Sequence, residues 1–329
     1  MLAAVFDGQG GIRLEERADP VPPPGEALVR VLLAGLCSTD RELRRGYMGF
    51  RGVAGHEFVG EVLAAPARPE LVGQRVVGEI NAACGQCDLC AEGLPRHCRH
   101  RTVLGILGRD GAFATHLCLP VANLHPLPAE LPTERALFAE PLAAAFAILE
   151  QVAVCGREAV VLGPGKLGRL IAEVLVLAGA EVTVLGRRAA SLAGLAARGV
   201  RTAVLGSEEA PPPGTAEIVV EATGHPDGLA QALRLVRPRG TVVLKTTCAG
   251  AHTVELAPVV VDEVTVVGSR CGPFEPALQA LAAGELTPER AIAARLPLER
   301  IEEAFALAFP PPAQARGPAG QKVVLEIGT

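Results

Sequence analysis

Four cysteines stand within fifteen residues of this chain, in the run CGQCDLCAEGLPRHC that begins at Cys84. They are Cys84, Cys87, Cys90 and Cys98, and their spacing is C-x2-C-x2-C-x7-C. Thiolates this close can surround one tetrahedral metal ion, whereas two disulfides among them would be strained. An iron–sulfur cluster is the main rival metal centre, but its common spacings differ from this one. Because four sulfurs leave no open coordination position, the run predicts a structural zinc ion.

Length and composition indicate a folded chain with more than one core. The 329 residues are long for a single domain, and 49% apolar with 20% charged residues argues against disorder. No charge-free apolar stretch reaches the roughly 18 residues of a membrane span, and the first residues lack a basic leader. The net charge of −5 shows no basic stripe, so we expect neither nucleic acid nor a membrane as partner. Thiols at Cys118, Cys155, Cys248 and Cys271 belong to no motif, which fits a reducing cytoplasm.

The first 140 residues read as strand-rich, because short apolar runs alternate with turn residues. We expect strands at Leu2–Phe6, Ala27–Leu33, Phe58–Leu63, Gln74–Ile80 and Ala112–Leu119. The rhythm changes at Pro141, where an apolar helical stretch begins. The sequence therefore predicts a β-rich domain over residues 1–140.

From residue 141 to residue 271 apolar strands alternate with helices. The expected strands are Ala159–Leu162, Glu181–Leu185, Arg201–Val204, Glu217–Val220, Thr241–Leu244 and Val264–Val267. The expected helices are Leu167–Ala178, one that ends at Gly199, and Asp227–Val236. Six such strands predict an α/β fold, a doubly wound parallel sheet of the Rossmann type. We expect the tail, 272–329, with helices near Pro276–Ala283 and Glu299–Ala308 and a strand at Lys322–Ile327, to pack back on the first domain.

A dinucleotide fingerprint follows the first strand of this alternating half. It reads Gly163-Pro164-Gly165-Lys166-Leu167-Gly168 and opens the next helix. The first glycine permits a tight turn, the second lets a pyrophosphate approach the backbone, and the third lets the helix pack closely on the sheet. Free N–H groups at the helix start would then meet the pyrophosphate.

The end of the second strand indicates which dinucleotide binds. An acidic residue there would bind the ribose hydroxyls of NAD, but this chain has Gly186-Arg187-Arg188. Because guanidinium groups pair well with phosphate, we expect a preference for NADP, with NAD possible. The alternative is that both arginines are solvated loop charges and the protein accepts either cofactor.

Three further residues have the chemistry of ligands to a second metal ion. They are Cys37 in GLCSTD, His56 in GHEFVG and Glu140 in AEPLA. One thiolate, one imidazole and one carboxylate leave a fourth position open, as catalytic zinc requires. Each alone is more often a buried cysteine or a surface glutamate, and spacing along the sequence does not bring them together.

These motifs, with the four-cysteine lobe, GPGKLG and VEATG, occur in the order found in zinc-dependent medium-chain dehydrogenases/reductases, which the whole chain resembles. It is most similar to the polyol and glucose dehydrogenase-like branch, because Glu-Pro-Leu stands where classical alcohol dehydrogenases of the family have a cysteine. The resemblance implies a GroES-like catalytic domain, 1–140, with the structural-zinc lobe at 84–98. It also implies a Rossmann domain, 141–271, and a C-terminal return to the catalytic domain, 272–329.

The resemblance also implies roles for single residues. Cys37, His56 and Glu140 would bind catalytic zinc, with Glu57 as the alternate carboxylate. Thr39 would take the proton of the substrate hydroxyl, and Asp40 would orient His56. Thr223 would lie near the nicotinamide ribose, and Lys322 would contact the pyrophosphate. Many relatives place a histidine five residues after the ligand cysteine, but this chain has Glu42 there, so its proton exit must differ.

The implied activity is hydride transfer between an alcohol, polyol or sugar hydroxyl and NADP or NAD, giving an aldehyde or a ketone. Two zinc ions per chain, a small-molecule alcohol or carbonyl substrate, and a homodimer or homotetramer are expected. Two alternatives stay open. One is a catalytically silent nucleotide-binding protein, and the other is a zinc-free quinone or enone reductase, a class that lacks this ligand set.

Overall fold

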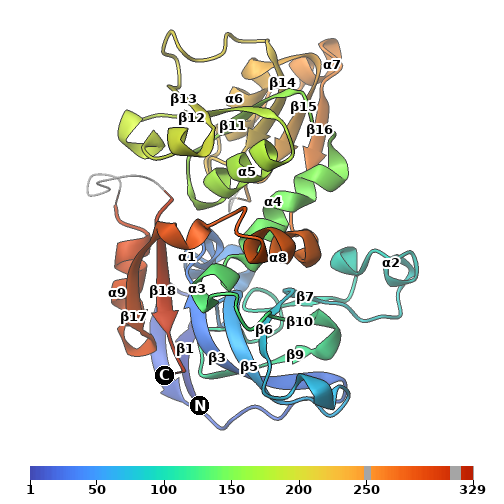
Figure 1. Cartoon of the computed structure of the whole chain (residues 1–329), viewed down its shortest axis with the longest axis vertical. Helices are drawn as coiled ribbons and strands as arrows, with labels where there is room; N and C mark the ends of the chain where they lie inside the picture. The colour runs from blue at the N-terminus through green and yellow to red at the C-terminus, as the bar shows by residue number, and fades with distance from the viewer. Residues whose placement is uncertain (248–252, 312–319, 329) are drawn as a thin grey trace. The chain divides into compact units, whose positions relative to one another are not determined.

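A computed structural model describes residues 1–247, 253–311 and 320–328 (Figure 1). The chain forms two compact units. Unit 1 comprises Met1–Glu140, Leu278–Pro312 and Lys322–Thr329, and unit 2 comprises Pro141–Ala277 and Ala313–Gln321. The expected tail, 272–329, thus belongs partly to each unit. Its residues 312–319 and 329, like Cys248, lie outside the described residues.

Unit 2 is built on a parallel sheet of six strands in the order β13-β12-β11-β14-β15-β16. The strands are β11 (Glu158–Leu162), β12 (Glu181–Gly186), β13 (Arg201–Val204), β14 (Ala216–Glu221), β15 (Val236–Leu244) and β16 (Thr265–Gly268). The order runs outward from β11 on one side and resumes from β14 on the other, so the topological switch point lies between these two strands. This confirms the predicted doubly wound fold.

The first strand and helix of unit 2 show why the sequence folds in this way. Four successive residues of β11 are buried, as expected of a parallel strand covered on both faces. In the next helix, α5 (Lys166–Leu177), the buried residues are spaced by three and four positions, which gives one apolar stripe. Gly179 follows with a φ of +82°, a left-handed conformation that ends the helix. The other helices that lie in this unit or begin or end in it are α4 (Ala139–Gln151), α6 (Gly228–Leu235), α7 (Ala257–Val261) and α8 (Phe274–Ala282).

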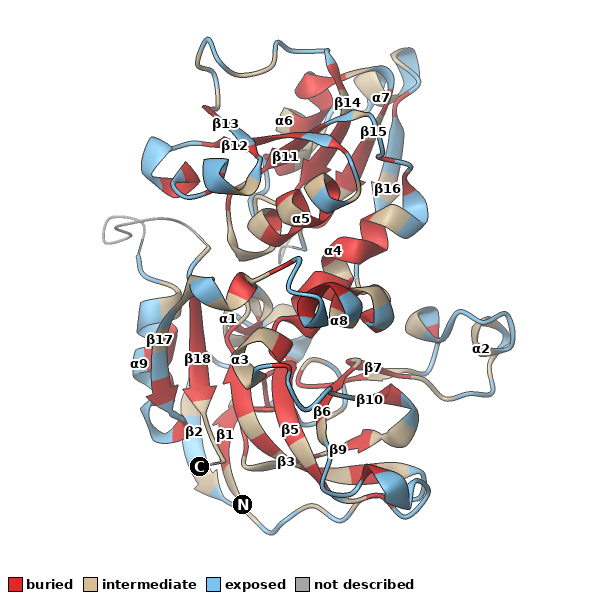
Figure 2. Ribbon diagram, viewed as in Figure 1, coloured by how far each residue is buried: buried red, intermediate tan, exposed pale blue. Residues whose placement is uncertain are grey.

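Unit 1 has a sheet of seven strands in the order β10-β6-β5-β3-β18-β17, with β9 also pairing with β3. The strands are β3 (Glu26–Gly35), β5 (Glu57–Ala64), β6 (Arg75–Gly78), β9 (His116–Pro120), β10 (Leu124–Pro126), β17 (Ile292–Pro297) and β18 (Lys322–Glu326). Burial alternates along β3 from Ala27 to Leu33, the period of a strand with one face in the core. Figure 2 shows β3, β5 and β18 as largely buried strands.

Smaller elements complete unit 1. A three-stranded sheet is formed by β1 (Leu2–Phe6), β2 (Ile12–Glu16) and β4 (Gly52–Val53), and a two-stranded sheet by β7 (Asn81–Ala82) and β8 (Thr102–Val103). The helices are α1 (Ser38–Arg44), α2 (Asp88–Ala91), α3 (Thr133–Ala136) and α9 (Ile301–Ala308). The seven-residue helix α1 is important for the site, because it begins directly after Cys37.

One helix prediction is wrong. The segment before Gly199 forms two short 3₁₀ turns, η5 (Ala189–Leu192) and η6 (Ala196–Arg198), instead of an α-helix. Gly194 lies between them with a φ of +82°, and this left-handed residue interrupts the helical pattern of apolar residues.

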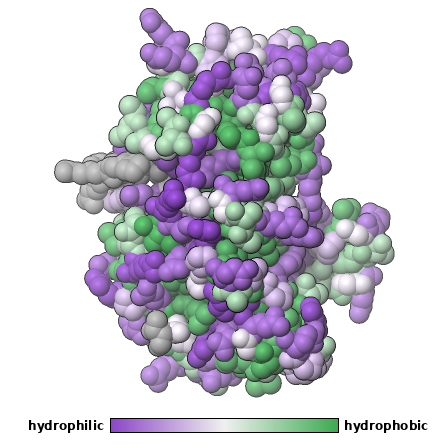
Figure 3. Space-filling model, in the orientation of Figure 1, coloured by the Kyte–Doolittle hydropathy of each residue, from purple (hydrophilic) through white to green (hydrophobic). Residues whose placement is uncertain are grey.

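Hydrophilic and hydrophobic side chains are interspersed over the face of the molecule in Figure 3. Among the described residues, no helix combines the length and the apolar character that a bilayer crossing requires.

Candidate active site and zinc centres

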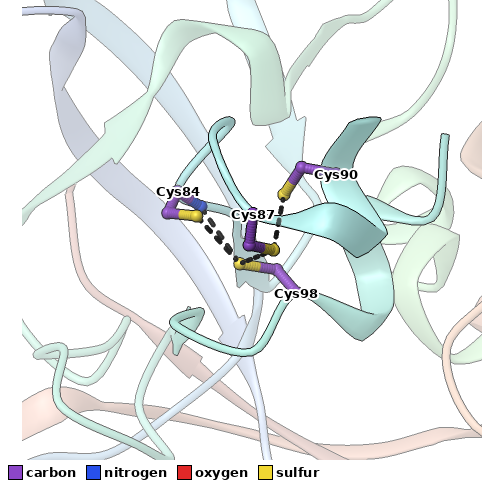
Figure 4. A group of neighbouring side chains, drawn as sticks. All are labelled: Cys84, Cys87, Cys90 and Cys98. Atoms are coloured by element: carbon purple, nitrogen blue, oxygen red, sulfur yellow. Dashed lines mark hydrogen bonds between the residues drawn. The ribbon is translucent and has the colours of Figure 1, made fainter. Parts of the chain in front are cut away.

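The four clustered cysteines lie on a lobe between β7 and β8. Their sulfur atoms face one another (Figure 4). The sulfur of Cys87 lies 3.6 Å from that of Cys90 and 3.7 Å from that of Cys98, and the sulfurs of Cys98 and Cys84 are 3.4 Å apart. Four thiolates that bind zinc at about 2.3 Å in a tetrahedron lie about 3.8 Å from one another. The sulfurs are therefore spaced for one ion, and all four cysteines are free thiols.

Backbone amides stabilise negative charge on this lobe. The sulfur of Cys98 accepts hydrogen bonds from the N–H groups of Cys84 and His100, both at 3.3 Å. Backbone hydrogen bonds at Arg99 and Cys90 lower the pKa of Cys87 to about 6. Burial and the neighbouring Cys87 sulfur raise the pKa of Cys90 to about 11. The pKa values of these two neighbouring thiols are thus shifted in opposite directions, and a bound cation would favour the deprotonated form of both. The donor set therefore fits a closed structural zinc site.

A second group of potential metal ligands is formed by Cys37, His56 and Glu57, whose ligand atoms all lie within 4.8 Å of one another. Cys37 follows β3, and His56 and Glu57 stand at the start of β5. These two strands are antiparallel neighbours in which Gly35 pairs with Glu57, so the sheet register brings Cys37 to His56. The set contains one sulfur, one nitrogen and one oxygen donor, which leaves a fourth position for a substrate, as in catalytic zinc sites.

Asp40 connects helix α1 to this group. Its Oδ2 accepts a hydrogen bond of 2.7 Å from the Cys37 N–H, which caps the helix, and its Oδ1 lies 3.3 Å from Nδ1 of His56. Burial opposes protonation of His56, but the Asp40 carboxylate and the Cys37 sulfur outweigh it and raise the pKa of His56 well above its usual value. The electrostatic field of these two groups favours a cation beside His56. With Nδ1 turned to Asp40, Nε2 is the nitrogen available to a metal.

Glu57 is held by a buried lysine. Its carboxylate Oε2 forms an ion pair with Nζ of Lys322, the first residue of β18. Burial works against the ammonium, yet the carboxylate of Glu57 and the sulfur of Cys37 raise the pKa of Lys322 above its usual value. The structure therefore gives Lys322 a partner at the metal site, and its contact with the pyrophosphate stays a prediction.

The carboxylate that the structure groups with Cys37 and His56 is that of Glu57. Glu140 lies in the first turn of α4, half-buried, and is not among the potential ligands grouped within the described residues. The sequence analysis placed Glu140 first and Glu57 as its alternate, and zinc binding by Glu140 stays a prediction. Strand pairing brings Glu57 to this group, because it begins β5 directly after His56.

The remaining residues predicted for this site lie on helix α1. The Thr39 hydroxyl oxygen is 3.8 Å from the sulfur of Cys37. Glu42, which replaces the histidine of many relatives, accepts ion-pair contacts from Arg41 at 2.9 Å and from Arg45 at 3.2 Å. Those contacts tie its carboxylate to neighbouring arginines of the same helix.

The dinucleotide fingerprint forms a pocket at the carboxyl ends of the unit 2 strands. Gly163 adopts a φ of +100°, and a Cβ there would lie 2.6 Å from the Ala222 carbonyl oxygen. A Cβ on Gly168 would lie 1.9 Å from the Gly163 carbonyl oxygen, so the helix packs against the turn only with glycine. A Cβ on Gly165 would meet nothing within 4 Å, and this open space is where a pyrophosphate would lie. Lys166 and Leu167, both half-buried, form the first turn of α5.

The rest of the pocket wall comes from three strand ends. Arg187 and Arg188 follow β12, line the pocket and are exposed. Thr223 follows β14, and its hydroxyl donates a 2.6 Å hydrogen bond to the buried carboxylate of Glu221. Sequence reasoning missed several lining residues, namely Leu185, Ser191, Leu205, Ala222, His225, Asp227 and Gln231. The rule that carboxyl ends of parallel strands share one edge could have found His225 and Asp227, which follow VEATG.

Comparison with known proteins identifies the family. Residues 23–129 match the model of the alcohol dehydrogenase GroES-like domain, and residues 167–283 match the model of zinc-binding dehydrogenases. D-altritol 5-dehydrogenase of Agrobacterium fabrum is 32% identical, over 92% of this chain and 94% of the relative. The chain belongs to the zinc-dependent medium-chain dehydrogenases/reductases.

Other members show the same likeness over their whole length. Erythritol/L-threitol dehydrogenase of Mycolicibacterium smegmatis is 29% identical, over 93% of this chain and 94% of the relative. The crystal structure of a putative zinc-binding dehydrogenase of Sinorhizobium meliloti 1021, bound to NADP, is 28% identical with a TM-score of 0.86, over 99% of this chain and 98% of that chain. As a medium-chain dehydrogenase, this protein is an NAD(P)-dependent oxidoreductase of alcohols or polyols that uses zinc.

Proposed function

We propose that this protein oxidises a secondary hydroxyl of a polyol to a ketone with NADP, or catalyses the reverse reduction. The observation that carries the proposal is the Cys37, His56 and Glu57 group, with one donor of each kind and room for a fourth ligand. Relatives named for erythritol, threitol and altritol support polyols as the substrate class. The second structural unit supplies the dinucleotide pocket.

The residues of this chain have separate tasks in the reaction. When bound by Cys37, His56 and Glu57, zinc supplies Lewis-acid polarisation of the substrate oxygen. Asp40 holds His56 in the orientation that presents Nε2 to the metal. Thr39 Oγ1 would accept the proton of the substrate hydroxyl and pass on its own, and a bound nicotinamide ring would accept the carbon-bound hydrogen as hydride. Because Glu42 is tied to Arg41 and Arg45, the proton leaves Thr39 by another route than an imidazole at that position.

The preference for NADP rests on charge at the end of β12. No carboxylate follows this strand, so the ribose hydroxyls of NAD lack their usual acceptor. Two guanidinium groups at the pocket wall favour the additional phosphate of NADP. Thr223 lines the same pocket and would contact the nicotinamide ribose, and Lys166 and Leu167 would offer their backbone at the start of α5.

We also propose that the protein works as a homodimer or homotetramer in the cytoplasm. Strand β16 is the last strand of the unit 2 sheet, and Val266 on it is 39% exposed. Val260 and Val261 of the preceding helix α7 are 75% and 77% exposed. An exposed apolar sheet edge of this kind is usually covered in solution.

The decisive experiment combines metal analysis with a substrate screen. Purified protein is analysed for zinc and then assayed for nicotinamide absorbance with polyols, sugars, simple alcohols and enones, each with NADP and with NAD. We expect two zinc ions per chain and turnover of a polyol with NADP. Cys37→Ser should remove one zinc and the activity. Cys118→Ser is the matched control, because burial raises the pKa of Cys118 to about 11 and its thiol lies in β9.

The alternatives predict different results. Bound cofactor without turnover of any compound would favour a silent nucleotide-binding protein. Turnover of an enone or quinone that survives Cys37→Ser would favour a zinc-free reductase.

A further inference from the structure

Lys322 and Glu57 lie on the two strands that flank β3, and they contact each other over Gly35, a residue of β3 without a side chain. In the sheet of unit 1, β3 lies between β5 and β18, with Gly35 opposite Glu57 on one side and opposite Val324 on the other. Lys322 is two residues before Val324 and therefore lies on the same face of the sheet. A Cβ on Gly35 would lie 2.5 Å from Oε2 of Glu57 and 2.7 Å from Cε of Lys322. The glycine is what lets the two charged groups touch.

The pair is sealed from water. Lys322 is 2% and Glu57 is 1% exposed. The ring of Phe138 covers the ammonium at 5.8 Å from Nζ to its centroid, and Phe138 itself is buried. An interaction between charges is much stronger in such a place than at the surface, and removal of one partner leaves the other charge buried alone.

The ammonium forms part of the charge balance of the metal site. The acidic side chains there are those of Cys37, Asp40 and Glu57, and Lys322 is in direct contact with one of them. Lys322 and a metal ion are thus two cations that share one carboxylate.

We propose that Lys322 is a positioning residue of the catalytic metal site, which competes with the metal ion for Glu57 and so keeps this ligand exchangeable. The inference rests on the proposed function, because it takes Cys37, His56 and Glu57 as the ligands. Lys322 holds Oε2 and leaves one oxygen of the carboxylate for the metal. In the metal-free protein it neutralises Glu57, so the site exists before metal binds. A carboxylate that an ammonium also holds would exchange on a bound zinc ion more readily than a thiolate in the same place.

The experiment measures zinc release from the full-length protein to an excess of a coloured chelator. The release phase that is missing in Cys37→Ser belongs to the catalytic site, and the other phase belongs to the cysteine lobe. Lys322→Met should slow the Cys37-dependent phase by at least about tenfold, because Glu57 then has only the metal as its counter-charge. Lys322→Arg should restore a rate close to that of the wild type.

Two further variants make the test specific. Gly35→Ala keeps both charges but places a methyl group between them, and it should slow the same phase if Lys322→Met does not fold. Lys245→Met is the matched control, since Lys245 is also buried but lies in unit 2, where its Nζ binds the backbone oxygen of Ala144 at 2.7 Å. That control should leave the Cys37-dependent phase unchanged.

The outcomes separate this inference from the proposed function. Two zinc ions with unchanged or faster release in Lys322→Met and Gly35→Ala would overturn the competition and leave the proposed function intact. A single zinc ion, with no phase that depends on Cys37, would overturn both.

Discussion

Asp40 offers the sharpest test of the site, because one carboxylate has two tasks. Its Oδ2 accepts the Cys37 N–H and caps α1, while its Oδ1 faces Nδ1 of His56. Loss of an N-terminal cap costs about 0.5–2 kcal/mol, and a buried N–H without an acceptor costs about 1–3 kcal/mol. Both figures describe the same broken bond, so Asp40→Ala should destabilise the zinc-free protein by about 1–3 kcal/mol.

Asp40→Asn separates the two tasks. The amide oxygen can still accept the Cys37 N–H, so the stability of the zinc-free protein should fall by less than about 1 kcal/mol. The negative charge beside His56 is lost, however, and loss of such a partner of a metal ligand weakens metal binding by about 10–100-fold. Both variants should therefore bind zinc more weakly, but only the alanine variant should unfold much more easily.

The measurements are urea unfolding of chelator-treated protein and zinc competition with a coloured chelator. Asp19→Asn is the control, because this carboxylate of unit 1 is 63% exposed and pairs with the N-terminus. Wild-type zinc affinity in Asp40→Asn would refute the role of the charge. Equal stability of the alanine and asparagine variants would refute the role of the cap.

Three further predictions concern other parts of the chain. Cys98→Ser should remove one zinc and lower the melting temperature, because the sulfur of this fully buried residue faces two other sulfurs. The control Cys155→Ser, at an exposed cysteine, should change neither. An unchanged melting temperature in Cys98→Ser would contradict the structural zinc. The double variant Arg187→Ala with Arg188→Ala should raise KM for NADP by about 10–100-fold and change KM for NAD little, since charged hydrogen bonds contribute about 1.5–3 kcal/mol. An equal rise of KM for both cofactors would contradict phosphate recognition. Burial raises the pKa of Glu173 although Arg198 and Arg169 oppose this, so the contribution of its carboxyl to stability is present at low pH and is lost as pH rises. Unfolding of the wild type relative to Glu173→Gln should therefore become easier as the pH rises above about 4.5, the ordinary pKa of this carboxyl, and a constant difference would disprove this.

The fold was largely predictable because unit 2 has a strong local pattern. Its inner strands β11, β12 and β14 are largely buried on both faces, so each one appears in the sequence as a short apolar run between turn residues. The β-strand Arg201–Val204 has the predicted bounds. The prediction was wrong before Gly199, because apolar spacing typical of a helix does not reveal that Gly194 adopts a left-handed conformation. Short or polar strands such as β2 were missed, since their burial shows little alternation.

The metal site was predictable only in part. The cysteine lobe could be read from spacing, because all four ligands come from one short segment. Cys37 and His56 were named from family motifs, and the order of Glu140 and Glu57 came from the same source. Strand register places Glu57 beside Cys37, and register is a property of pairs of strands that no single segment contains. The same limit hid the partner of Lys322, which is 265 residues from Glu57 in the sequence.

The pairing of β3 with β5 and β18 links the stability of unit 1 to the chemistry of its metal site. A shift of β18 by one residue would turn Lys322 to the opposite face of the sheet and put Val323 in its place. Glu57 would then be a buried carboxylate without a counter-charge, which is costly unless a metal ion is bound. The hydrogen-bonded pairing of β3 with β5 and β18 therefore also fixes the charge of the metal site. Gly35 takes part in the strand pairing and also leaves room for the contact between Lys322 and Glu57. We therefore expect substitutions there to change metal release and unfolding together.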